Sequence, residues 1–175
     1  MVIARTKLVI EDPFIRFDPY YLVMNYRGPK PERFYTRLSE LIPLVYAVDR
    51  GQVQERTFKW DNVGDTQKFD VFWEISKPLD RFTYFRMSVE LAGQSTKGEG
   101  GARVRLFGTL RTEYPQDTLW QRSIFYEMIR MLWHTIFYKT QRLKYLHEGR
   151  ALIRNMEIEL KKAFEEFRVV EPGKG

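Results

Sequence analysis

The sequence predicts an α+β protein in which an antiparallel sheet packs on a long C-terminal helix, with two short helices after the first strands. Three observations support this prediction. Apolar and polar residues alternate over residues 52–114, apolar residues follow helical spacing over residues 34–45, and residues 117–168 contain no proline. A period of two indicates strands that bury one face, whereas a spacing of three to four residues indicates a helix.

The N-terminal part is expected to be extended chain followed by helix. Residues 6–27 are rich in β-branched and aromatic side chains, which favour strands. A Gly-Pro-Lys-Pro sequence ends this segment, and Pro31 suits the first turn of a helix, where a missing N–H costs nothing. Pro43 is expected to divide that helix into two short pieces, because an internal proline removes a hydrogen bond.

The middle of the chain is expected to be an antiparallel meander. Its alternating runs are separated by short turns at residues 62–65, 77–80 and 92–102. A parallel sheet would need helices between the strands, and these turns are too short to hold them. One face of the sheet is therefore expected to be buried and the other wet.

The C-terminal part is helical throughout and too long for one domain to cover. As one rod, residues 117–168 would measure about 78 Å. A helix over residues 118–146 is expected to occupy the sheet. If the remainder folds back, it is expected to do so after a break near Gly149, although a single glycine is only a weak break. The following apolar stripe consists of Leu152, Met156, Leu160, Ala163 and Phe167.

Such a stripe should not face water, so it either folds back on its own domain or pairs with a second chain. We expect the second outcome, a homodimer through the C-terminal helix. Residues 1–148 are accordingly assigned to the main domain and residues 149–175 to a helical extension.

The order of these elements resembles a known superfamily. The stretches that carry the resemblance are residues 41–44 (LIPL), 72–80 (FWEISKPLD) and 101–108 (GARVRLFG). Over residues 20–138 the pattern is similar to the START-like (SRPBCC) helix-grip superfamily. The segment up to Phe17 and the helix beyond about Leu146 depart from it. The resemblance implies a helix-grip-like fold, in which a curved sheet wraps the last helix around a cavity. Members of that superfamily bind lipids, hormones, polyketides or aromatic substrates and share no universal catalytic set, so no catalytic residue is implied.

The first functional hypothesis is non-catalytic binding of a small apolar or amphipathic ligand between sheet and helix. Residues 124–138 are so apolar that this segment is expected to be buried over most of its circumference. Methionine and aromatic side chains often line such pockets, although they also fill solid cores. The candidate ligand-binding residues are Trp73, Phe85, Met87, Trp120, Met128, Met131 and His134.

The alternative hypothesis is a basic protein that associates with RNA or a ribonucleoprotein, since the formal net charge is +6. Arginines at a spacing of two residues would share one face of a strand, where they either contact phosphates or pair with Glu90, Asp70 and Glu74. The candidate nucleic-acid-binding residues are Arg103, Arg105, Arg111, Lys139, Arg142 and Lys144.

Several classes of site are not expected. The chain has no cysteine, which excludes a disulfide scaffold, a zinc finger, an iron–sulfur site and a cysteine nucleophile. Its two histidines are thirteen residues apart, and no metal or cofactor site is expected. No catalytic motif is evident, so an enzyme is not favoured. No membrane span or secretion signal is expected, which predicts a cytoplasmic protein, and the scarcity of asparagine fits a thermophile.

Overall fold

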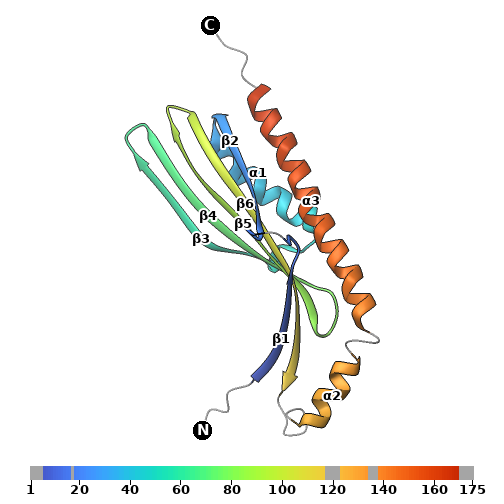
Figure 1. The fold of residues 1–175 in the computed structure, drawn as a ribbon. Helices are drawn as coiled ribbons and strands as arrows, with labels where there is room; N and C mark the ends of the chain where they lie inside the picture. The colour runs from blue at the N-terminus through green and yellow to red at the C-terminus, as the bar shows by residue number, and fades with distance from the viewer. Residues whose placement is uncertain (1–5, 17, 117–122, 134–137, 170–175) are drawn as a thin grey trace, which may run out of the picture.

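The computed structural model describes residues 6–16, 18–116, 123–133 and 138–169. It confirms the α+β class: six strands form one open, curved antiparallel sheet, and α1 and α3 lie on the same face of it (Figure 1). The helices and strands, in chain order, are β1 (Thr6–Pro13), β2 (Tyr21–Pro29), η1 (Pro31–Arg33), α1 (Phe34–Tyr46), η2 (Arg50–Gln52), β3 (Val53–Val63), β4 (Thr66–Pro78), β5 (Thr83–Thr96), β6 (Glu99–Gln116), α2 (Ile124–Trp133) and α3 (Lys139–Val169).

The strands β3 to β6 form the predicted meander, and β6 is the longest of them. The turn expected over residues 92–102 is wrong in extent, because β5 continues to Thr96 and β6 begins at Glu99. Its 18 residues pair with β5 on one side and with both β1 and β2 on the other. β2 pairs with residues 99–107 and β1 with residues 109–116. The last part of β6 and β1 therefore continue past the end of the rest of the sheet (Figure 1).

The core lies between one face of the sheet, the inner face, and the helices α1 and α3. The predicted alternation is confirmed, because every second residue is buried from Phe69 to Ile75 in β4 and from Thr83 to Leu91 in β5. Sheet residues in the core include Phe69, Val71, Trp73, Ile75, Phe85, Met87, Val89, Leu91, Val104, Leu106 and Leu110. The intervening side chains form the outer face, over which no helix lies (Figure 1).

The expected division of the first helix at Pro43 does not occur. α1 continues through Pro43 as one helix of 13 residues. Leu38, Ile42 and Tyr46 on its inner side are each 0% exposed. Burying a large side chain contributes about 1.5–3 kcal/mol, so three of them offset the roughly 3 kcal/mol cost of an internal proline.

The expected break near Gly149 is also absent, because α3 runs through this position without interruption. Gly149 is buried, and a Cβ atom added there would lie 2.3 Å from the Phe14 ring. A Cβ atom added at Gly108 of β6 would lie 2.5 Å from the same ring. The two glycines therefore leave room for Phe14 between α3 and the sheet, and Gly149 serves close packing rather than helix termination.

The apolar stripe of the last helix packs against its own domain, which is the first of the two outcomes left open by the sequence. Met156, Leu160 and Ala163 are each 0% exposed, and Ile153 and Phe164 also belong to the core. This half of α3 covers the sheet, whereas residues 124–133 of the expected 118–146 helix form the separate helix α2. The residues before and after position 149 belong to one helix and contribute to one core.

Candidate functional site

The five predicted ligand-binding residues that the structure describes do not gather at one site. Trp73, Phe85 and Met87 are at most 3% exposed and belong to the core. Met128 and Met131 lie on α2 and are 58% and 64% exposed. Trp73 also borders an open hollow of about 610 Å³ between α1 and β3. Trp120 and His134 lie outside the described residues, and a ligand cavity between sheet and helix remains a prediction.

Arg142, predicted to contact nucleic acid, is instead an internal anchor. Its side chain is 6% exposed. Its guanidinium donates to Asp12 Oδ2 from Nε at 3.0 Å and from a terminal nitrogen at 2.7 Å, and also to Thr112 Oγ1. These bonds join α3 to β1 and β6, so the guanidinium is not available to a phosphate. Lys139 and Lys144 are exposed on α3.

The predicted arginine row lies on the outer face of β6, and two of its members are paired with acids. An Arg105 nitrogen is 3.2 Å from Glu90 Oε2, and Arg111 Nε is 3.0 Å from Glu113 Oε1. Arg103 donates from Nε to Asn25 Oδ1 at 3.4 Å. The sequence left open whether Arg105 would contact phosphates or pair with Glu90, and in the structure Arg105 pairs with Glu90.

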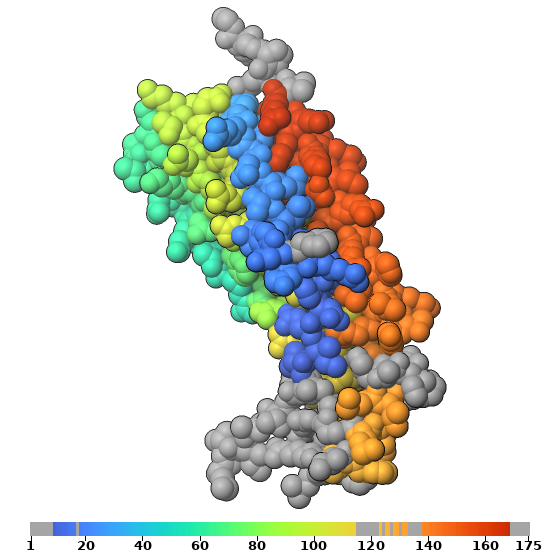
Figure 2. Space-filling view, in the orientation of Figure 1, coloured from blue at the N-terminus to red at the C-terminus, as the bar shows by residue number. Residues whose placement is uncertain are grey.

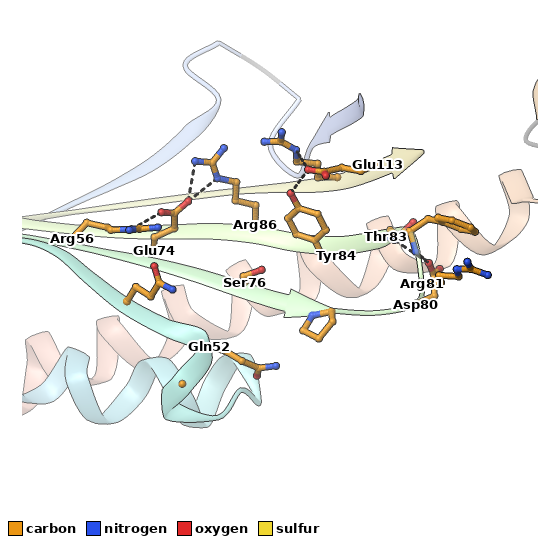
Figure 3. Close-up of a pocket in the computed structure, with 15 residues that line it drawn as sticks. Gln52, Arg56, Glu74, Ser76, Asp80, Arg81, Thr83, Tyr84, Arg86 and Glu113 are labelled. Carbon is orange, nitrogen blue, oxygen red and sulfur yellow. Dashed lines mark hydrogen bonds and ion pairs between the residues drawn. The ribbon is translucent and has the colours of Figure 1, made fainter. Parts of the chain in front are cut away.

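A hollow of about 790 Å³, called here the lower hollow, opens on the outer face near the β4–β5 turn (Figure 3). Glu74 projects into it and accepts hydrogen bonds from Arg56 Nε and Arg86 Nε, both at 2.9 Å. Burial alone would raise the pKa of Glu74, but the hydrogen bonds from the two arginines outweigh it and lower the pKa. Glu74 is therefore a carboxylate held between two cations.

Tyr84 closes the other side of the lower hollow (Figure 3). Its hydroxyl donates to Glu113 Oε1 at 2.6 Å. Burial, followed by this bond to a carboxylate, raises the pKa of Tyr84 to about 12. Both glutamates of the lower hollow thus already accept hydrogen bonds, which leaves neither placed as a general base. Among the described residues, no group of three or more His, Cys, Asp or Glu side chains could hold a metal ion.

The expectation that residues 124–138 form a largely buried segment is wrong for α2. This helix lies at the end of the molecule toward which β1 and the end of β6 extend (Figures 1 and 2). Its first turn is capped by Ser123, whose Oγ accepts from the Tyr126 N–H at 3.2 Å. Its exposed large side chains, called here the α2 face, are Phe125 (60%), Met128 (58%), Ile129 (48%), Met131 (64%) and Leu132 (58%).

A signal for the α2 face was present in the sequence. Four of its five residues, at positions 125, 128, 129 and 132, follow helical spacing and so form one stripe. Such a stripe predicts that the helix has a partner but not whether that partner is its own sheet. Neither the sequence nor its periodicity distinguished this stripe from the buried one in α3.

Comparison with known proteins adds no assignment. No protein-family model matches the chain, and no curated protein matches it. One solved structure, of an uncharacterised protein from Rhizobium leguminosarum, aligns with 90% of this chain and 99% of that chain at 8% identity and a TM-score of 0.24. A likeness at this score supports no argument about fold or function. No helix in the described part of the chain is long and apolar enough to cross a membrane.

Proposed function

We propose that this protein is a binding protein that acts as a homodimer, joined through the α2 face. The observation that carries the proposal is the exposure of five large apolar side chains on one short helix. Monomeric proteins expose single apolar residues routinely, whereas a contiguous apolar patch marks an interaction surface. The homodimer expected from the sequence used the stripe of the last helix, which is buried, so the dimer proposed here uses a different segment.

The size of the α2 face suits a second copy. Large side chains bury about 150–250 Å² each, so five half-exposed ones present on the order of 500 Å² per chain. Two copies would together bury about 1,000 Å², which reaches the lower limit of a specific interface. A two-fold axis also covers both patches in one closed contact, which is the commonest arrangement of homodimers.

The composition of the α2 face favours a protein partner over a lipid surface. Methionine and phenylalanine are enriched in the buried centres of protein interfaces. A membrane-surface helix would instead carry many Lys and Arg residues on its polar side. The whole α2 sequence, IFYEMIRMLW, contains one basic residue, Arg130.

Sedimentation equilibrium tests the proposal. The unmodified protein should be a dimer at tens of micromolar. The double variant Met128→Glu/Leu132→Glu should be a folded monomer whose thermal unfolding matches that of the unmodified protein diluted until it dissociates, because dimerisation itself stabilises the folded state. The matched control is Leu143→Glu/Ile158→Glu, which places the same two charges on exposed apolar residues of α3 (each 44% exposed). It should remain a dimer.

Two results would overturn the dimer. One is an unmodified protein that stays monomeric at 100 micromolar. The other is a control variant that dissociates as fully as the α2 variant. If the protein is monomeric but sediments with anionic vesicles, and the double variant does not, the α2 face belongs to a membrane surface and the dimer is rejected.

A further inference from the structure

A second hollow, called here the upper hollow, lies on the outer face of the sheet near the β5–β6 turn and has a volume of about 920 Å³. Its floor is formed by the small residues Ala92 and Gly101, which the register places on the outer face of β5 and β6. Longer side chains of these two strands and of the neighbouring strands β2 and β4 rise around this floor. They are Asn25, Arg27, Lys68, Asp70, Gln94 and Arg103.

The cations of the upper hollow differ from those of the lower hollow. Arg27, Lys68 and Arg103 are all exposed, and none makes an ion pair with any residue that the structure describes. In the lower hollow, by contrast, Arg56 and Arg86 both pair with Glu74.

Only one acid, Asp70, lies among the described residues of the upper hollow. The hollow therefore carries a local excess of two positive charges. Charged side chains that surround a concave surface without internal partners attract ligands of the opposite sign.

Aromatic rings continue the same face beyond the upper hollow. Tyr21 and Phe107 lie directly opposite each other in the β2–β6 register. Tyr21 is 41% exposed, and the Arg105 guanidinium lies 5.9 Å from the centre of its ring. Along β6, Phe107 is four residues from Arg103, or about 13 Å at the strand rise of roughly 3.3 Å per residue.

We propose that the outer face of the sheet binds single-stranded nucleic acid, with phosphates at Arg27, Lys68 and Arg103 and a base stacked on Tyr21. Cations that hold the backbone, next to rings that stack on bases, are the two components of sequence-tolerant single-strand binding. A free phosphate compound would use the cations alone and would leave the rings without a role. This surface is separate from the α2 face, so the two proposals can fail independently.

Salt dependence of binding to a labelled single-stranded uridine 12-mer is the first test. Three phosphate contacts predict a slope of log affinity against log salt of about −2, or about 20-fold weaker binding at 200 mM than at 50 mM salt. The triple variant Arg27→Gln/Lys68→Gln/Arg103→Gln should lose nearly all of this slope.

The matched control removes three exposed cations of α3 instead. Lys139→Gln/Lys144→Gln/Arg154→Gln changes the net charge equally and should keep a slope near −2. Absence of 12-mer binding at 50 mM salt, or the same loss of slope in both triple variants, overturns the proposal. Unchanged thermal unfolding of both variants shows that the comparison concerns binding.

A second test separates a nucleic acid from a free phosphate compound. Tyr21→Ala should weaken binding of the 12-mer about fivefold or more without changing the salt slope, because a stacked base is lost. It should leave binding of tripolyphosphate unchanged. Tripolyphosphate that binds as tightly as the 12-mer, with no effect of Tyr21→Ala on either ligand, overturns the assignment to nucleic acid.

Discussion

Two apolar helical segments of this protein differ in solvent exposure: the α2 face is exposed, and most of the apolar stripe in the second half of α3 is buried. In α3, Met156 and Leu160 are 0% exposed against the sheet and α1. In α2, Met128 and Leu132 are both 58% exposed. An apolar stripe is therefore not by itself evidence of an interface, because its meaning depends on whether its own domain offers a surface to cover.

The difference arises from where each segment lies along the sheet. α1 and the second half of α3 cover the inner face, where β3, β4, β5 and β6 lie side by side (Figure 1). α2 lies at the end of the molecule toward which β1 and the last part of β6 extend past the other described strands (Figure 1). Two strands offer too little apolar surface to bury a helix of ten residues.

The sharpest test of this comparison is one leucine from each segment. Leu160→Ala should lower the free energy of unfolding by about 3 kcal/mol, because it leaves a cavity in the core. Leu132→Ala should change the stability of the monomer by less than about 0.5 kcal/mol, as expected for a surface position. Urea denaturation at submicromolar protein concentration measures both, and equal costs would contradict the contrast.

The stability of the protein should be nearly as sensitive to Arg142, which joins the start of α3 to β1 and β6. Arg142→Gln should lower the free energy of unfolding by about 2 kcal/mol, because the buried Thr112 and the Asp12 carboxylate lose their donor. Arg154→Gln, at an exposed arginine just over three turns later on α3, is the control and should have almost no effect. Thermal and urea unfolding measure the difference, and a cost below that of the control would show that Arg142 is not an anchor.

Gly149 tests why α3 approaches the sheet so closely. Alanine normally stabilises a helix interior relative to glycine by about 1 kcal/mol. Here Gly149→Ala should instead destabilise the protein by about 1–2 kcal/mol, because the new Cβ meets the Phe14 ring. The cost should shrink in a Phe14→Leu background. A stabilising Gly149→Ala in the unmodified protein would show that the ring does not limit the approach.

The smallest effect on stability is expected from a substitution on the outer face of the sheet. There Glu74 forms ion pairs with Arg56 and Arg86 and is not covered by α1 or α3. The pKa of Glu74 is lowered in the folded state, so its contribution is complete above pH 4.5, its ordinary value, and is lost as pH falls through the lowered pKa. A partly exposed pair of this kind contributes less than about 1 kcal/mol. Glu74→Gln should therefore flatten the acid side of the stability profile, and an unchanged profile in urea titrations from pH 2 to pH 7 would exclude this role.

The strands were predictable from the sequence. Two helix breaks that the sequence suggested do not occur in the structure. The period of two over residues 52–114 identified the meander, because side chains alternate in any strand. Pro43 and Gly149 are local signals for a helix end, but both lie inside helices. Local propensity was overruled in each case by packing: of Ile42 and Tyr46 in α1, and of Phe14 under α3.

The candidate binding surfaces were predictable only in part. The arginine row on β6 follows from its spacing, and so does its placement on one face. Which strand lies next to each residue decides that Arg103 bonds to Asn25 of β2 and that Arg105 pairs with Glu90 of β5. Arg27 and Lys68 come from β2 and β4, on opposite sides of the β5–β6 pair, and no sequence spacing connects them.

The sequence by itself determined the local geometry of this protein: which residues form strands and helices, and which side chains share a face. Periodicity suffices for this, since the direction of each side chain follows from the backbone of its own element. Only the tertiary structure decided that the stripe of α3 is buried, that the α2 face is not, and that Arg142 is an anchor rather than a binding residue. The physical reason is that burial is a competition among all apolar segments for one limited sheet face, and its outcome depends on contacts between residues far apart in the chain.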